Sequence, residues 1–221
     1  MRYIVKGIEV RSENVAKSIK EVSRPLVEWL KNRDMTDTAL DYGCGKLRYT
    51  KFVAMKSLHL GIVDSKLQLD RSQQINGLAT TVRRYAESNW PGCKICDLET
   101  FLVGISDKYD FILCSNVLSA IPCPKVRAKS LRALHNSLSP KGTMLVLNQH
   151  TNSYFKEVRT KAGTIEHLNG WLLNSHKGGA YYGILNKETT IRLLERFTYR
   201  IKDAWIEGQS NYVLVEKGKS L

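Results

Sequence analysis

Two closely spaced glycines follow a short apolar run in the first quarter of the chain. Residues 40–48 read Leu-Asp-Tyr-Gly-Cys-Gly-Lys-Leu-Arg, which places Gly43 and Gly45 between a predicted strand and a predicted helix. Glycine permits the tight turn that such a connection needs, and without a Cβ it leaves room for a ligand against the backbone. The following helix would direct unpaired N–H groups and the positive end of its dipole toward that ligand. The pattern therefore predicts a binding site beyond the carboxyl end of a sheet strand.

Three aspartates stand at the ends of predicted strands around this turn. Asp41 lies two residues before the first glycine, and Asp64 lies 19 residues beyond the second. Asp97 ends a third apolar run. An acid at the position of Asp64 can accept hydrogen bonds from both hydroxyls of a ribose, although Asp64 and Asp97 could also simply cap the helices that follow them. Three acids around one Gly-x-Gly turn favour a ligand site over separate helix caps.

Short apolar runs alternate with amphipathic stretches along most of the chain. The apolar runs predict strands at residues 38–42, 59–64, 93–97, 109–114 and 143–147. The amphipathic stretches predict helices at residues 15–31, 48–56, 66–75 and 124–138, with Pro25 starting a second segment of the first helix. This alternation requires crossover connections and predicts an α/β fold with a doubly wound, mostly parallel sheet.

The C-terminal part departs from simple alternation. Residues 187–197 predict a helix, and two β-rich runs follow at residues 199–207 and 211–217. The three residues between these runs, Gly-Gln-Ser, are too few for a crossover. The two strands must therefore pair antiparallel, as a hairpin.

The composition is that of a folded domain of ordinary size. The 221 residues are 43% hydrophobic and 25% charged, which excludes wholesale disorder and allows a sizeable core. No apolar run approaches the roughly 20 residues that a membrane span needs, and no signal-peptide pattern opens the chain. The five dispersed cysteines predict free thiols in a reducing compartment, and hence a cytoplasmic protein with no membrane partner. Cys93 and Cys96 have the spacing of half a zinc site, but no second pair follows, so we predict no metal site.

The chain is basic, with 34 Lys and Arg residues against 21 Asp and Glu and a net charge of +13. A basic surface attracts phosphate, so nucleic acid stays open as a partner. The surplus charge is spread along the chain rather than gathered in one arm. Its densest group, at residues 125–132, alternates with apolar residues as the solvated face of a helix does.

With these residues in view, the sequence resembles the class I S-adenosylmethionine-dependent methyltransferases. The segment from Asp41 to Gly45 matches the first motif of that family, including the acid two positions before the first glycine. Residues 109–118 resemble the fourth-strand motif. Residues 138–147 resemble the family's "L-x-P-G-G" turn into the fifth strand, with Lys141 in place of the first glycine. Leu47 stands where the family often has a third glycine.

The resemblance implies a Rossmann-like fold, with a seven-stranded, mostly parallel sheet that ends in an antiparallel C-terminal hairpin. It implies S-adenosyl-L-methionine as the cofactor and S-adenosyl-L-homocysteine as the product formed from it. The residues that match the family's cofactor site are Asp41, Gly43, Gly45, Asp64, Asp97 and Ser115. Among these, Asp64 falls on the acid that binds the ribose, and Asp97 on the acid that contacts the adenine amine.

We expect one methyltransferase domain over residues 1–221. Its parts would be N-terminal helices at 1–36, a cofactor-binding core at 37–147, a substrate-covering insertion at 148–186, and a final helix and β-hairpin at 187–221. The insertion is rich in aromatic and imidazole side chains, which suits a lid over a planar substrate, with an ordinary packed insertion as the alternative. Tyr154 and Tyr181 are candidate substrate contacts, and His150 is the one candidate general base.

The expected function is methyl transfer to a small-molecule or metabolite acceptor. An RNA or protein methyltransferase is an alternative that the basic charge supports, and a non-catalytic protein that binds S-adenosylmethionine is another. The residues after the fourth strand read Ser-Asn-Val-Leu, where amino-methylating DNA enzymes have Asp/Asn-Pro-Pro-Tyr/Phe. This difference argues against that class of enzyme.

Overall fold

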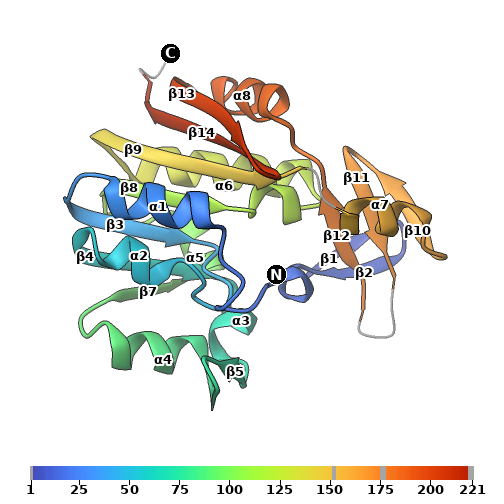
Figure 1. Ribbon diagram of the computed structural model, residues 1–221, viewed down its shortest axis with the longest axis horizontal. Coiled ribbons are helices and arrows are strands. Elements are labelled where there is room, and N and C mark those ends of the chain that lie inside the picture. The colour runs from blue at the N-terminus through green and yellow to red at the C-terminus, as the bar shows by residue number, and fades with distance from the viewer. Residues whose placement is uncertain (1, 151–152, 175–177, 219–221) are drawn as a thin grey trace.

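A seven-stranded sheet forms the centre of the computed structural model, which describes residues 2–150, 153–174 and 178–218 (Figure 1). In spatial order the strands are β13 (Tyr199–Glu207), β14 (Ser210–Lys217), β9 (Leu138–Gln149), β8 (Tyr109–Ser115), β3 (Thr36–Tyr42), β4 (Ser57–Asp64) and β7 (Lys94–Asp97). Neighbouring strands from β9 to β7 are parallel, and β14 pairs antiparallel with both β9 and β13. The predicted doubly wound sheet and its antiparallel C-terminal hairpin are confirmed.

Successive residues of the central strands point into two separate cores, one on each face of the sheet. In β8, for example, Phe111 belongs to one core and Ile112 to the other. Helices α1 (Arg24–Asn32), α2 (Thr50–Ala54), α3 (Lys66–Asp70) and α4 (Val82–Asn89) contribute to the first core, and α5 (Leu98–Val103), α6 (Pro124–Ser137) and α8 (Lys187–Glu195) to the second. Because both faces are covered, β8 is a nearly continuous apolar run. None of these helices, nor any other in the described part of the chain, is long and apolar enough to span a membrane.

A smaller group of elements, which we call the cap, lies beside the sheet, at the right in Figure 1. It consists of the hairpin β1 (Arg2–Val5) and β2 (Ile8–Arg11), helix α7 (Ser153–Thr160), and the antiparallel sheet of β10 (Thr164–His167), β11 (Gly170–Leu173) and β12 (Ala180–Gly183). Two backbone hydrogen bonds of 2.9 Å join its two parts, from Arg11 N to Gly179 O and from Gly179 N to Glu9 O. Val10, Leu172 and Tyr181 are buried in their shared core. The cap therefore unites segments from opposite ends of the chain.

The predicted helix at residues 15–31 is wrong over its first half. Residues 12–15 form a short 3-10 helix, and the α-helix begins only at Arg24, with Pro25 in its first turn. Proline suits the first turn of a helix and not its interior, because it lacks an N–H group. The expected N-terminal helices of residues 1–36 are in fact one α-helix preceded by a β-hairpin. The turn of that hairpin, Lys6-Gly7, has positive φ at both residues.

The predicted helix at residues 66–75 is also wrong beyond Asp70. A second hairpin follows, made of β5 (Gln73–Ile75) and β6 (Leu78–Thr80). Its turn is Asn76-Gly77, with φ of 50° and 86°. Asn-Gly is a strong signal for a two-residue hairpin, and here it outweighs the helical pattern. The predicted helix at residues 48–56 is shorter, and the predicted strand at residues 143–147 is longer at both ends.

We expect Gly61→Ala to lower the free energy of unfolding by about 1–3 kcal/mol, because core packing leaves no room for a methyl group there. A Cβ on Gly61 would lie 2.5 Å from Oη of Tyr109. Urea denaturation of both proteins measures the difference. In a Tyr109→Ala background the same substitution should cost little, because the clashing ring is gone. An equal cost in both backgrounds would contradict this packing.

Candidate functional site

A cavity of about 670 Å³ opens at the carboxyl ends of β3, β4 and β8. Residues 12–18, which follow the N-terminal hairpin, form one wall, and β12 of the cap forms another. This is the edge at which open α/β sheets bind ligands, and the volume suits a small molecule or cofactor. The predicted Gly-x-Gly turn lies in its wall.

The two glycines of the turn play different parts. Gly43 and Gly45 have φ of 73° and 58°, a region that side chains rarely adopt. A Cβ on Gly43 would lie 2.3 Å from Cγ2 of Val117, so the room expected there for a ligand is taken by that side chain. At Gly45 the nearest heavy atom to such a Cβ is that of Ala16, 3.8 Å away. Gly45 is therefore the glycine whose backbone is open to a ligand.

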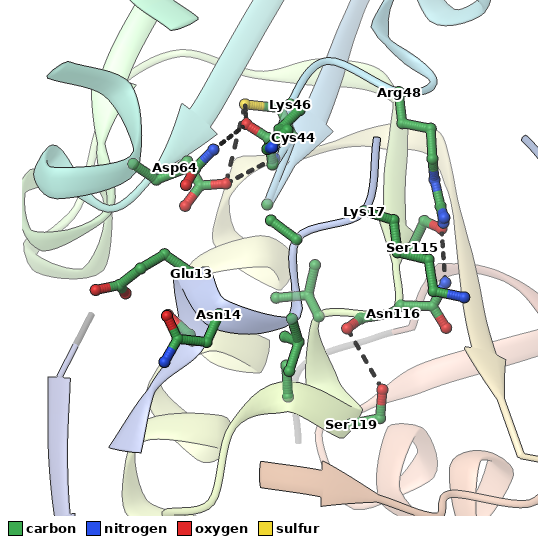
Figure 2. Close-up of a pocket in the computed structure, with 18 of the residues that line it drawn as sticks. Glu13, Asn14, Lys17, Cys44, Lys46, Arg48, Asp64, Ser115, Asn116 and Ser119 are labelled. Carbon is green, nitrogen blue, oxygen red and sulfur yellow. Dashed lines mark hydrogen bonds between the residues drawn. The ribbon is translucent and has the colours of Figure 1, made fainter. Parts of the chain in front are cut away.

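Asp64 sits at the end of β4 with its carboxylate turned to the glycine turn (Figure 2). Its Oδ2 accepts a hydrogen bond from Gly45 N at 2.8 Å, and its Oδ1 accepts one from Ser65 N at 2.7 Å. Burial raises the pKa of Asp64 to about 6. The N-cap residue of α3 is Ser65, whose Oγ accepts a hydrogen bond from Gln68 N. Helix capping therefore does not explain the position of the Asp64 side chain. Each carboxylate oxygen can accept a further hydrogen bond.

Asp41 is more deeply buried than Asp64, with 3% of its surface exposed, and also borders the cavity. Its Oδ2 accepts a hydrogen bond of 2.6 Å from Oγ1 of Thr50, the first residue of α2. Burial raises the pKa of Asp41 to about 6 despite that bond. Asp41 thus ties the end of β3 to the helix that follows the glycine turn.

Asp97 is the N-cap of α5. Its carboxylate accepts hydrogen bonds from Thr100 N at 2.8 Å and from Thr100 Oγ1 at 3.1 Å, and the backbone bond holds its pKa below the usual value. Among the described residues that line the cavity, its neighbour Leu98 is present and Asp97 is not. The structure therefore shows the capping role, and the predicted adenine contact stays a prediction.

Ser115 borders the cavity at the end of β8, as predicted. Asn116 follows it with a φ of 60° and also lines the cavity. Its N donates to Leu147 O and its Oδ1 accepts from Gln149 N, each at 2.7 Å. These bonds to β9 fix Asn116 in its unusual conformation at the cavity wall.

The three residues predicted to act on a substrate lie in different places. His150 is bonded through its N to Gln209 O, and its Nδ1 lies 3.3 Å from the amide nitrogen of Asn211. It is not among the described cavity-lining residues, so the geometry does not support it as a base. Tyr181 does line the cavity, almost fully buried, with its ring edge-on to His167. The side chain of Tyr154 lies outside the described residues.

The segment between the N-terminal hairpin and α1 supplies site residues that the sequence did not suggest. Glu13, with 7% of its surface exposed, and Lys17 both line the cavity, and Arg48 joins them from the loop before α2. No sequence motif marks residues 12–18. The pairing of β2 with Gly179 brings them over the sheet, and this pairing joins residues far apart in the sequence. A pattern read along the sequence cannot show such a contact.

Comparison with known proteins gives one relative in sequence and many in structure. No protein-family model matches the chain. The chain is 35% identical over 215 residues to the uncharacterized protein YmfD of Escherichia coli K12, covering 97% of this chain and 96% of that protein.

Solved structures share the fold at low sequence identity. An S-adenosylmethionine-dependent methyltransferase from Clostridium acetobutylicum has a TM-score of 0.62 at 14% identity, over 90% of this chain and 94% of its own. The 1,6-didemethyltoxoflavin-N1-methyltransferase of Burkholderia thailandensis, solved with 1,6-didemethyltoxoflavin and S-adenosylhomocysteine, has a TM-score of 0.60 at 14% identity, over 93% of this chain and 80% of its own. The chain thus belongs to one family with YmfD, and its fold is that of the class I S-adenosylmethionine-dependent methyltransferases.

Proposed function

We propose that this protein is an S-adenosylmethionine-dependent methyltransferase whose acceptor is a small molecule. The observation that carries the proposal is the Asp64 carboxylate, fixed by two backbone N–H groups beside the open backbone of Gly45. Both lie at the edge of the sheet where open α/β folds bind ligands, and solved structures of this fold contain S-adenosylhomocysteine. The volume of the cavity is typical of a binding site for a small-molecule cofactor.

The residues that would hold the cofactor are Asp41, Gly43, Gly45, Asp64 and Ser115, with Asp97 at the adenine end. When bound, S-adenosylmethionine supplies a methyl group already activated by a positively charged sulfur. The acids Glu13, Asp41 and Asp64 line the same cavity and would attract that charge, whereas Lys17, Lys46 and Arg48 in the same wall would repel it. Gly43 contributes by admitting Val117 against the turn, rather than by leaving space for the ligand.

The remaining task of the protein is to position an acceptor and exclude water. Holding a nucleophile in line with an activated methyl group at about 3 Å can supply most of the rate enhancement. The cap contributes Phe155, Tyr181 and Tyr182 to the cavity wall, opposite the strand ends. These rings shield the site from bulk water and offer flat surfaces to a planar acceptor. A small-molecule acceptor suits a cavity of this size, and the neighbour from Burkholderia was solved with 1,6-didemethyltoxoflavin bound.

Methyl transfer from labelled S-adenosylmethionine tests the proposal. Label should enter small molecules of a cell extract and leave RNA and protein unlabelled. Label in RNA, with an affinity that falls steeply with salt, would support the nucleic-acid alternative that the net charge of +13 favours. Tight cofactor binding without transfer to any of the three pools would indicate a non-catalytic binding protein.

Substitution of Asp64 by Asn should weaken binding of S-adenosylhomocysteine by about 1–3 kcal/mol, because one charged acceptor of the ribose hydroxyls is lost. Isothermal titration calorimetry measures the change. Asp70→Asn is the matched control, since Asp70 pairs with Lys66 and Arg83 outside the cavity lining of the described residues. Equal affinities for the wild type and Asp64→Asn would contradict the assignment. Asp97→Asn in the same series tests the predicted adenine contact.

Affinity for S-adenosylhomocysteine should fall as the pH is lowered through about 6. The pKa of Asp64 is raised to about 6 in the folded protein, and a hydroxyl donates to the ionised form. Binding must then release protons near this pH, and the complex weakens below it. Calorimetry at pH 5.5 and 7.5, in buffers of different ionisation enthalpy, measures both effects. Asp41 has a similar pKa and borders the same cavity, so a smaller dependence can remain in Asp64→Asn. An affinity that stays constant over this range, or a dependence of undiminished size in Asp64→Asn, would contradict the role of the Asp64 carboxylate.

A further inference from the structure

A second, smaller cavity of about 260 Å³ adjoins the first. It lies between the segment before α1, the end of β9 and the turn of the β13–β14 hairpin at Gly208 and Gln209. Lys17, Arg48 and Asn116 line both cavities. By contrast, Gly45 and Asp64 line only the larger one. The smaller cavity is therefore separate from the residues assigned to the cofactor, and it offers room for an acceptor.

Two cations stand where the cavities meet. Figure 2 shows Lys17 and Arg48 on the side of Ser115 and Asn116, away from Asp64 and Glu13. The Arg48 guanidinium donates through Nη1 to Glu21 O at 3.1 Å and lies 4.5 Å from the centre of the Tyr49 ring. These contacts orient the guanidinium while using only part of its donor capacity.

Neither cation forms an ion pair within the described part of the chain. None of the ion pairs found there includes Lys17 or Arg48, and the one hydrogen bond of the Lys17 ammonium goes to the neutral Oε1 of Gln149, at 3.4 Å. Burial and the nearby charge of Arg48 lower the pKa of Lys17, against the opposing attraction of Glu21. Glu21 lines both cavities and Glu207 lines the smaller one, and both residues are exposed to solvent.

Two adjacent positive charges repel one another, and the exposed carboxylate of Glu21 offsets this repulsion only in part, since Lys17 keeps a lowered pKa. An anion bound between them would remove the rest. An arginine and a lysine together provide several charge-assisted donors for the oxygens of a carboxylate or phosphate. We propose that the acceptor is a small acid whose oxyanion group binds between Lys17 and Arg48, where it would orient the acceptor toward the larger cavity. This inference rests on the proposed function, because it treats the larger cavity as the cofactor site.

Titration of inorganic phosphate into the protein saturated with S-adenosylhomocysteine tests this proposal, at constant ionic strength and with acetate in parallel. Binding of S-adenosylhomocysteine to the wild type is measured first, so failure of the proposed function would be seen separately. We expect phosphate or acetate to bind the saturated wild type, and Lys17→Gln or Arg48→Gln to weaken that binding by about tenfold or more. Arg48→Lys should restore part of it. The affinity of each variant for S-adenosylhomocysteine is measured in parallel, because both residues also line the larger cavity.

Lys20→Gln is the matched control, because it removes one charge from an exposed lysine of the same segment that lies outside both cavity linings. Anion binding to this control should equal that of the wild type. No anion binding to the saturated wild type would overturn the proposal, as would binding that survives both substitutions. Anion binding to the free protein that S-adenosylhomocysteine abolishes, with weaker S-adenosylhomocysteine affinity in the variants, would also overturn it. In that case Lys17 and Arg48 would bind the carboxylate of the cofactor rather than an acceptor.

Discussion

The hydrogen bond between the Asp64 carboxylate and the Gly45 backbone determines the shape of the site. It connects the ends of two neighbouring parallel strands, β3 and β4, across the turn that must face the ligand. Further bonds support the same turn, from Gly43 N to Val63 O at 2.8 Å and from the Gln68 side chain to Gly45 O at 2.6 Å. The turn is therefore held in one conformation by its own chain, and a ligand need not order it. The raised pKa of Asp64 is the electrostatic cost of placing a carboxylate there.

The cap completes the cavity from the side opposite the glycine turn. The N-terminal hairpin and the second part of the cap contact each other through Val10 and Gly179, which are 169 residues apart in the sequence. A Cβ on Gly179 would lie 2.6 Å from the Ile8 side chain, so close packing joins the two parts. As a result, residues 12–18 pass over the strand ends, and their side chains complete the site. The residues proposed to bind the cofactor thus come from the strand ends and the glycine turn. Those proposed for an acceptor come from the cap, the N-terminal segment, the end of β9 and, for Arg48, the loop before α2.

Sequence patterns predicted the parts of the molecule that are governed by local rules. The strands of the parallel sheet are continuous apolar runs because both faces are buried, and the glycine turn needs residues that tolerate positive φ. The same rules failed where a sequence pattern was compatible with two different local structures. The Asn76-Gly77 turn forms a hairpin where helical periodicity continued. The helix expected from residue 15 begins at Arg24, close to the second segment predicted to start at Pro25. Lys17 and Arg48 belong to no sequence motif, and only folding brings the two side chains close together. His150 was expected to act as a base because of its residue type, but its hydrogen bonds lie along β14 instead.

The central claim is that the cavity beside Gly45 and Asp64 is a site for S-adenosylmethionine. Calorimetric titration of the wild-type protein with S-adenosylmethionine and with S-adenosylhomocysteine tests it most directly, with NAD as a larger comparison ligand that contains the same adenosine group. The structure predicts one site per chain with micromolar affinity for both sulfur compounds and no measurable binding of NAD. Absence of binding by both compounds, or a preference for NAD, would contradict the assignment and leave the methyltransferase fold with a different ligand.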